Sequence, residues 1–225
     1  NWSDLVATSE PDATPEPEQQ DEQDTSVTEG LQIDINGIEI VDARLSYQDA
    51  QSAQNIAINA FNLTTSALSF NEPVKLTSDF IVRLNELELA IDLAGRLTAN
   101  PETGAYSFDD LVIHQTAKGP AIPAGEQSVI ARLNLNANTE TQVLAIDQLT
   151  VDALGVSVQG TLQLSQFLLE PRYTGQLSSN TFNLRQLMDQ LGSALPKTQN
   201  SEAFSSTSIQ LDFSGDTNKV GIKPL

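Results

Sequence analysis

The side chains best suited to acid–base or nucleophilic chemistry are few in this sequence. It contains a single histidine, His114, and no cysteine. A hydrolytic site needs a nucleophile beside a base, whereas a lone histidine in a strand-like run is usually a surface residue or a hydrogen-bonded one. Carboxylates occur at Asp109 and Asp110 and at Asp147 and Asp152, but scattered acids are expected on a chain with a formal net charge of −19. Their spacing is not that of a calcium-binding loop.

The sequence also lacks the longer motifs of common enzyme sites. It has no G-x-S-x-G nucleophile turn, no phosphate-binding Walker loop and no glycine fingerprint for dinucleotides. We therefore predict that the chain is not an enzyme and holds no cofactor or metal.

The net charge restricts the partners. A chain carrying −19 is repelled by the phosphates of nucleic acids and by an anionic membrane surface. No run of about 18 apolar residues occurs, so we expect no segment to span a bilayer. The absence of cysteine fits the cytosol or a bacterial periplasm. The chain starts at Asn1 without methionine or a secretory signal, so we expect a piece of a longer protein whose targeting signal lies outside it.

With so little reactive chemistry, the most informative stretch is 87–97. Its odd positions carry Leu, Leu, Ile, Leu, Gly and Leu, and its even positions carry Glu, Ala, Asp, Ala and Arg. Successive side chains of a strand point to opposite faces, so the stretch predicts a β-strand with one apolar face, about 33 Å long at roughly 3.3 Å per residue. That face must be covered by a second sheet, a helix, the curled sheet itself or a ligand.

The chain divides into two kinds of sequence. Residues 1–30 hold nine acidic residues and no Lys or Arg, which predicts an acidic disordered linker. A docking tail for a basic partner is the alternative. Residues 31–225 consist of alternating runs separated by short turns, which predicts an all-β, mainly antiparallel domain of about nine to eleven strands in a meander.

Two features indicate that this sheet is bent. The apolar residues change parity between Ile40 and Tyr47, which predicts a β-bulge or a bend. Glycines that could supply curvature occur at Gly37, Gly95, Gly155 and Gly160. The same glycines could equally form the corners of a β-sandwich.

One short amphipathic helix is predicted near the C-terminal end, at 183–195. Asn183 can cap it, Gln186 completes a capping box, and Pro196 ends it. Its apolar stripe comprises Leu184, Leu187, Met188, Leu191 and Leu195. We expect this stripe to pack on one end of the sheet, and the alternative is a mobile gate.

Several motifs occur in an order that resembles a known family. The sequence GIEIVDARLSYQD (37–49) is followed by IAINAFNLTT (56–65) and NEPV (71–74), and GQL (175–177) precedes FNLRQLMDQLG (182–192) with Leu-Pro at 195–196. This order resembles the AsmA family of Gram-negative bacteria over roughly residues 31–225. The acidic stretch ahead of it resembles the variable insert of that family. None of these motifs is catalytic.

The resemblance implies a periplasmic protein that supports outer-membrane homeostasis and is tethered to the inner membrane by a helix outside this segment. Members of the family look like relatives of bridge-like lipid-transfer proteins, whose curved β-sheet forms an apolar groove. We therefore expect a long, strongly twisted and curled sheet that binds the acyl chains of phospholipid, with membrane contact through another part of the protein. The alternative is a scaffold that aids outer-membrane assembly through contacts with envelope proteins, with its sheet closed over its own core.

The residues predicted to line the lipid-binding face come from three of the alternating runs. They are Leu87, Leu89, Ile91, Leu93, Leu97, Leu133, Leu135, Val156, Val158, Leu162 and Leu164.

Overall fold

The computed structural model describes residues 35–49, 54–196, 198–200 and 202–224, which form one antiparallel β-sheet and one α-helix. The predicted acidic linker at 1–30 lies outside the described residues. The strands are β1 (Glu39–Asp49), β2 (Gln54–Thr65), β3 (Val74–Leu84), β4 (Leu87–Asn100), β5 (Ala105–Lys118), β6 (Glu126–Asn138), β7 (Val143–Ala153), β8 (Val156–Ser165), β9 (Arg172–Ser179), β10 (Gln210–Asp216) and β11 (Val220–Pro224). A short 3-10 turn, η2 (Pro123–Gly125), precedes β6, and the helix α1 (Leu184–Gln190) lies between β9 and β10.

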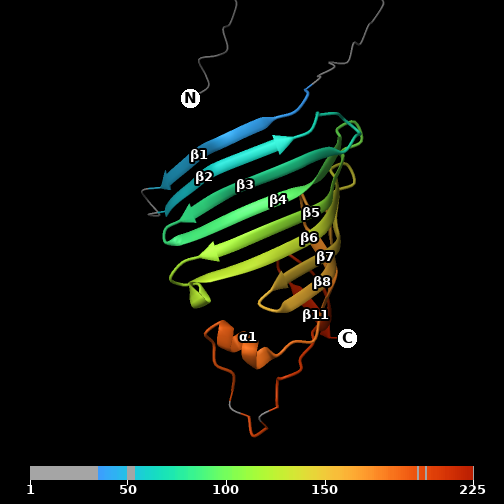
Figure 1. Ribbon diagram of the computed structural model, residues 1–225. Coiled ribbons are helices and arrows are strands. Elements are labelled where there is room, and N and C mark those ends of the chain that lie inside the picture. Colours follow the sequence, from blue (N-terminus) through green and yellow to red (C-terminus); the bar gives the residue numbers. More distant parts are fainter. Residues whose placement is uncertain (1–34, 50–53, 197, 201, 225) are drawn as a thin grey trace, which may run out of the picture. The chain divides into compact units, whose positions relative to one another are not determined.

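The order of the strands in the sheet is their order in the chain. Each strand pairs antiparallel with the next, from β1 to β11, and Figure 1 shows β1 to β6 side by side in this order. The sheet is not closed, and within the described part of the chain β1 and β11 form its two edges. The prediction of an all-β, antiparallel meander of nine to eleven strands is therefore confirmed.

Tight turns keep the apolar positions of neighbouring strands on one face. Leu154 and Gly155, which join β7 to β8, have φ of +54° and +77°, as a two-residue hairpin with matching twist requires. The turn between β3 and β4 is also two residues long and pairs Leu84 with Leu87. Because paired residues share a face, the even apolar residues of β3 and the odd ones of β4 lie together.

The predicted change of parity in the first strand is a β-bulge. Ile40 pairs with Leu63 and Ala43 pairs with Phe61, so β1 advances by three residues where β2 advances by two. Asp42 lies within this bulge, and its φ of +50° is left-handed. The bulge returns Ile40 and Ala43 to the same face of the sheet.

The helix is shorter than the sequence predicted. It covers 184–190 rather than 183–195. The Asn183 side chain caps its start by accepting a hydrogen bond from the Gln186 amide at 3.0 Å, as expected. Its end is fixed by Gly192, which has a φ of +67°, and by amide bonds from Gly192 to the Asp189 carbonyl and from Ser193 to the Met188 carbonyl. This pair of bonds is a Schellman motif, which stops a helix before any proline is reached.

The sheet has almost no conventional core. Among the described residues, Val74 and Phe182 are the buried hydrophobic ones, at 7% and 8% exposure, and no side chain is less than 2% exposed. All eleven strands belong to one sheet, and very few of their side chains are buried. The described part of the chain is therefore a single layer rather than two packed layers.

Candidate functional site

The apolar face of the sheet is the candidate site, and the strand register defines it. Leu97 in β4 pairs with Phe108 in β5, which pairs with Leu135 in β6. Leu135 in turn pairs with Ile146 in β7, and Ile146 pairs with Leu162 in β8. Directly paired residues have their side chains on the same face, so one row of large apolar side chains crosses five successive strands.

The eleven residues predicted to line a lipid-binding surface all lie on this apolar face. They belong to β4, β6 and β8, and the register through β5 and β7 places them on the same side. Each of them is half-buried. Residues in the core of a β-sandwich would be buried, so this intermediate exposure distinguishes the apolar face from a sandwich core.

Six other strands, β2, β3, β5, β7, β9 and β10, contribute residues to the apolar face that the sequence analysis did not select. These residues include Phe61, Phe80, Phe108, Ile113, Ile146, Val151, Leu177 and Phe213. The rings of Phe61 and Phe80 lie 5.8 Å apart between their centroids. The alternation of β3 was visible in the sequence, whereas bulges interrupt the alternation of β5 and β7 and conceal their apolar face.

Glycines on the apolar face lie beside large side chains from the next strand. A Cβ atom at Gly95 would lie 2.5 Å from Cε1 of Phe108, and one at Gly160 would lie 2.6 Å from Cδ2 of Leu177. Gly175 is covered in the same way by the Phe213 ring. Of the glycines predicted to bend the sheet, Gly95 lies at a register shift between β4 and β5, whereas Gly155 forms a hairpin turn.

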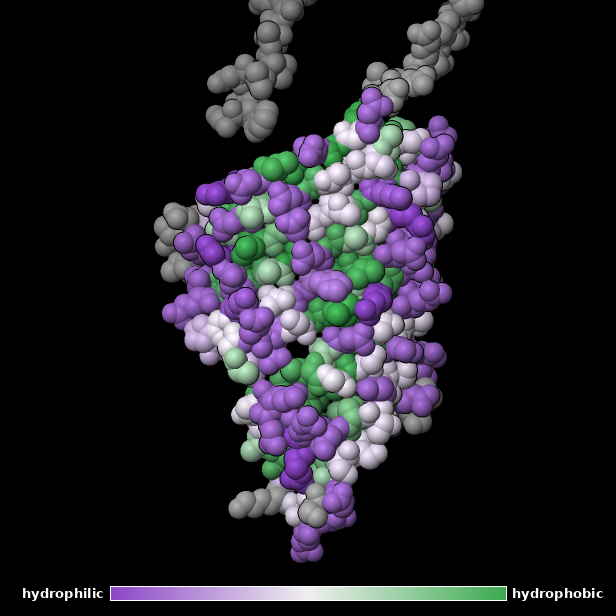
Figure 2. Space-filling model, in the orientation of Figure 1, coloured by the Kyte–Doolittle hydropathy of each residue, from purple (hydrophilic) through white to green (hydrophobic). Residues whose placement is uncertain are grey.

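The opposite face of the sheet is polar. Figure 2 shows hydrophilic side chains predominating over the face in view, with hydrophobic side chains between them. Along β4 the contrast is direct, because Asp92, Ala94 and Arg96 are exposed whereas the apolar residues between them are half-buried.

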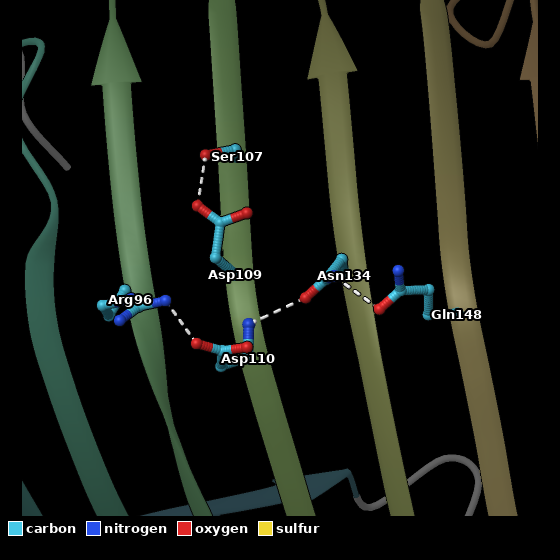
Figure 3. Close-up of polar contacts among 6 residues, drawn as sticks. All are labelled: Arg96, Ser107, Asp109, Asp110, Asn134 and Gln148. Atoms are coloured by element: carbon cyan, nitrogen blue, oxygen red, sulfur yellow. Dashed lines mark hydrogen bonds and ion pairs between the residues drawn. The ribbon is translucent and has the colours of Figure 1, made fainter.

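A chain of polar contacts crosses β4 to β7 on the polar face, as Figure 3 shows. Arg96 forms an ion pair with Asp110, and the Asp110 amide donates to Oδ1 of Asn134 at 2.8 Å. Nδ2 of Asn134 donates to Oε1 of Gln148 at 3.3 Å. Nearby, the Ser107 hydroxyl donates to Asp109 at 3.1 Å. Each of these six side chains takes part in at least one of these contacts.

The other ionisable residues singled out in the sequence also lie on the polar face. His114 is exposed and is paired in register with Asp92. Asp152 accepts a hydrogen bond from Arg132 at 2.7 Å, and the Ser157 hydroxyl together with Arg132 lowers the pKa of Asp152 below its ordinary value of 3.8. Within the described ranges, no group of three or more potential metal ligands comes together.

Several cavities among the described residues are lined mainly by residues of the polar face. The largest described here, about 760 Å³, crosses β7 to β11 and is lined by Asp147, Gln163, Gln176, Asp212 and Lys223, among others. A smaller one of about 160 Å³ adjoins Asp110 and Asn134. Among the predicted lining residues, Leu133, Val156 and Leu162 contact such cavities.

The helix and its flanking segments form a lobe in the connection between β9 and β10. Figure 1 shows α1 beyond the ends of the strands. Phe182 bridges to Thr207, and the Arg185 guanidinium donates to the Ala203 carbonyl at 3.1 Å. Of the predicted gate residues, Leu184, Leu187, Met188 and Leu195 are half-buried, whereas Leu191 is 40% exposed.

Comparison with known proteins identifies no relative. No family model matches the chain, and no curated protein or solved structure is significantly similar to it. In the described part of the chain, no helix has the length and apolar character needed to cross a membrane.

Proposed function

We propose that this chain binds the acyl chains of glycerophospholipid along its apolar face, as a periplasmic lipid-transfer domain of the AsmA type. The observation that carries the proposal is that all eleven strands place apolar side chains on one face, which no second layer covers in the described residues. Exposing so large an apolar surface to water is unfavourable in free energy, and such surfaces often mark binding sites. The motif order that resembles the AsmA family supports the same function.

The proposed groove is formed by the sheet curling toward its apolar side. Bulges with left-handed residues in β1, β2, β5 and β7 support this curvature, because bulges bend a strand and increase its twist. The lower exposure of the apolar face along β4 and β9 agrees with a concave surface. In Figure 1 the C-terminal strands lie behind the more central ones, as a curled sheet requires.

The dimensions suit a lipid. Eleven strands have ten spacings of about 4.8 Å, so the apolar face extends roughly 48 Å across the strands, compared with about 30 Å for the hydrocarbon core of a bilayer. Each methylene transferred from water to this face would contribute about 0.8 kcal/mol. The charged head group would remain in water, so the proposal requires no buried ion pair.

Native mass spectrometry of the chain purified from a Gram-negative periplasm, with lipid extraction of the same sample, tests this proposal. We expect at least one phospholipid per chain in the wild type and its loss in Ile91→Asp, because a charge in the middle of the apolar face is incompatible with an acyl chain. Since Ile91 is half-buried on an open face, the variant is expected to keep its β-sheet circular dichroism.

The matched control is Ala94→Asp, which adds the same charge to the exposed, polar side of the same strand. This variant is expected to retain the lipid. A folded wild-type protein without lipid would instead favour the scaffold function, and unfolding of Ile91→Asp alone would indicate that this face is packed as a core.

A further inference from the structure

The same kind of bulge occurs in four strands of the sheet. In β2 it comprises Ile58-Asn59-Ala60-Phe61, in which Ala60 is left-handed with a φ of +50°. The other three comprise Ile40-Val41-Asp42-Ala43 in β1, Phe108-Asp109-Asp110-Leu111 in β5 and Ile146-Asp147-Gln148-Leu149 in β7. In each of these three as well, the third residue is left-handed, with φ of +50°, +51° and +55°.

These bulges keep the apolar face continuous. In a regular strand, residues three apart point to opposite faces. Here Phe108 pairs with Leu135 and Leu111 pairs with Leu133, so both ends of the bulge in β5 contribute to the apolar face. In β7, Ile146 and Leu149 pair with Leu162 and Gly160 in the same way. Without the bulges, half of each strand would turn its apolar side chains to the polar side.

Two of the bulges are each held from the polar side by an asparagine on the next strand. Oδ1 of Asn62 in β2 accepts the amide of Asp42 at 2.9 Å, and Oδ1 of Asn134 in β6 accepts the amide of Asp110 at 2.8 Å. Each asparagine also uses its Nδ2 group on another bulge. Asn62 donates to the Ala60 carbonyl at 3.2 Å, and Asn134 donates to Gln148 at 3.3 Å (Figure 3).

We propose that Asn62 and Asn134 are positioning residues for lipid binding. Although they lie on the polar face and touch no lipid, they fix the bulges that hold the strands in register and set the curvature of the apolar face. This inference rests on the proposed function and adds to it the residues that determine how well the groove accepts a lipid.

The test compares Asn134→Ala, Asn134→Asp and Asn136→Ala in the full chain, purified as above, by phospholipid retained per folded chain. Asn134→Ala removes the acceptor of the Asp110 amide. We expect roughly fivefold less retained lipid, which is the change in an equilibrium constant that the loss of one typical hydrogen bond produces. Asn134→Asp keeps the acceptor oxygen and is expected to retain lipid near the wild-type level. Asn136 lies two residues away on the same face and donates only a long bond of 3.4 Å to Asp147, so its loss is expected to change little.

Several outcomes would overturn the inference. One is a wild-type lipid content in folded Asn134→Ala, and another is an equal loss of lipid in Asn136→Ala or in Asn134→Asp. If Asn134→Ala does not fold, the same comparison is made at the other asparagine, with Asn62→Ala against Thr64→Ala, an exposed residue of the same strand. A folded wild-type chain without lipid would contradict the proposed function itself, and is thereby distinguished from failure of the positioning role.

Discussion

Asp152 illustrates how the polar face is stabilised by individual residues. The Ser157 hydroxyl and the Arg132 guanidinium bind its ionised form and lower its pKa below the ordinary value of 3.8. A carboxylate whose pKa is lowered by folding stabilises the folded state above the ordinary pKa. That stabilisation is lost as the pH falls through the lowered pKa. Because Asp152 is open to solvent, the contribution is small.

We predict that Ser157→Ala and Arg132→Gln each raise the pKa of Asp152. Carboxyl ¹³C NMR titration measures this directly. Correspondingly, Asp152→Asn is expected to lower the Tm at neutral pH and to have no effect once the pH lies below the lowered pKa. A pKa that neither substitution moves would contradict the assigned hydrogen bonds.

At the scale of the element, the bulges impose a conformational cost on the strands. Ala60 in β2 has a φ of +50°, a left-handed conformation that costs an ordinary L-residue roughly 1–2 kcal/mol. Glycine adopts this conformation without that cost.

We predict that Ala60→Gly stabilises the sheet by about 1 kcal/mol, whereas Ala57→Gly, in the regular part of β2, destabilises it by roughly 0.5–1 kcal/mol. The midpoints of urea unfolding measure both changes. Destabilisation by both substitutions would indicate that the bulge at Ala60 is absent in solution.

The elements also show which parts of the fold can be predicted from sequence. The alternation of 87–97 predicts its strand because one face is apolar and the other charged, and β4 continues only three residues further, to Asn100. The parity change near Asp42 predicts a bulge. The change between Phe108 and Leu111 has the same form, but it is the pairing of β5 with β4 and β6 that places both residues on the apolar face, and local periodicity does not contain that pairing.

The predicted end of the helix, at Leu195, was wrong for a different reason. Leu191 and Leu195 continue the helical period, and that period favoured a helix as far as Pro196. Gly192 nevertheless ends the helix, because its left-handed conformation allows the last carbonyls to be satisfied one turn earlier. The placement of the predicted lining residues on one face follows from alternation and register together, whereas the bound lipid remains a proposal.

At the scale of the whole molecule, the described residues form mainly strands, and each strand is paired with its neighbours in the chain. In the described part of the chain, the substantial backbone contacts follow the strand order. Stability in such a molecule is approximately a sum of neighbour terms, as in repeat proteins.

We therefore predict that the sheet opens from its edges. In native-state hydrogen exchange, the amides of β10 and β11 are expected to exchange with a lower free energy of opening than those of β4 to β6, which have the longest paired strands. A single free energy of opening for all strands, equal to that of global unfolding, would contradict this prediction.

The scarcity of buried side chains also has a calorimetric consequence. Unfolding of an ordinary globular domain raises the heat capacity by about 12–15 cal/mol/K per residue, because apolar groups become hydrated. In this sheet the half-buried apolar face is partly hydrated already, so we predict a smaller increment per residue for the lipid-free chain in differential scanning calorimetry. Lipid on that face would dehydrate it, and the lipid-loaded chain would then approach the ordinary value. The heat capacity of unfolding would thus report how much of the sheet is filled.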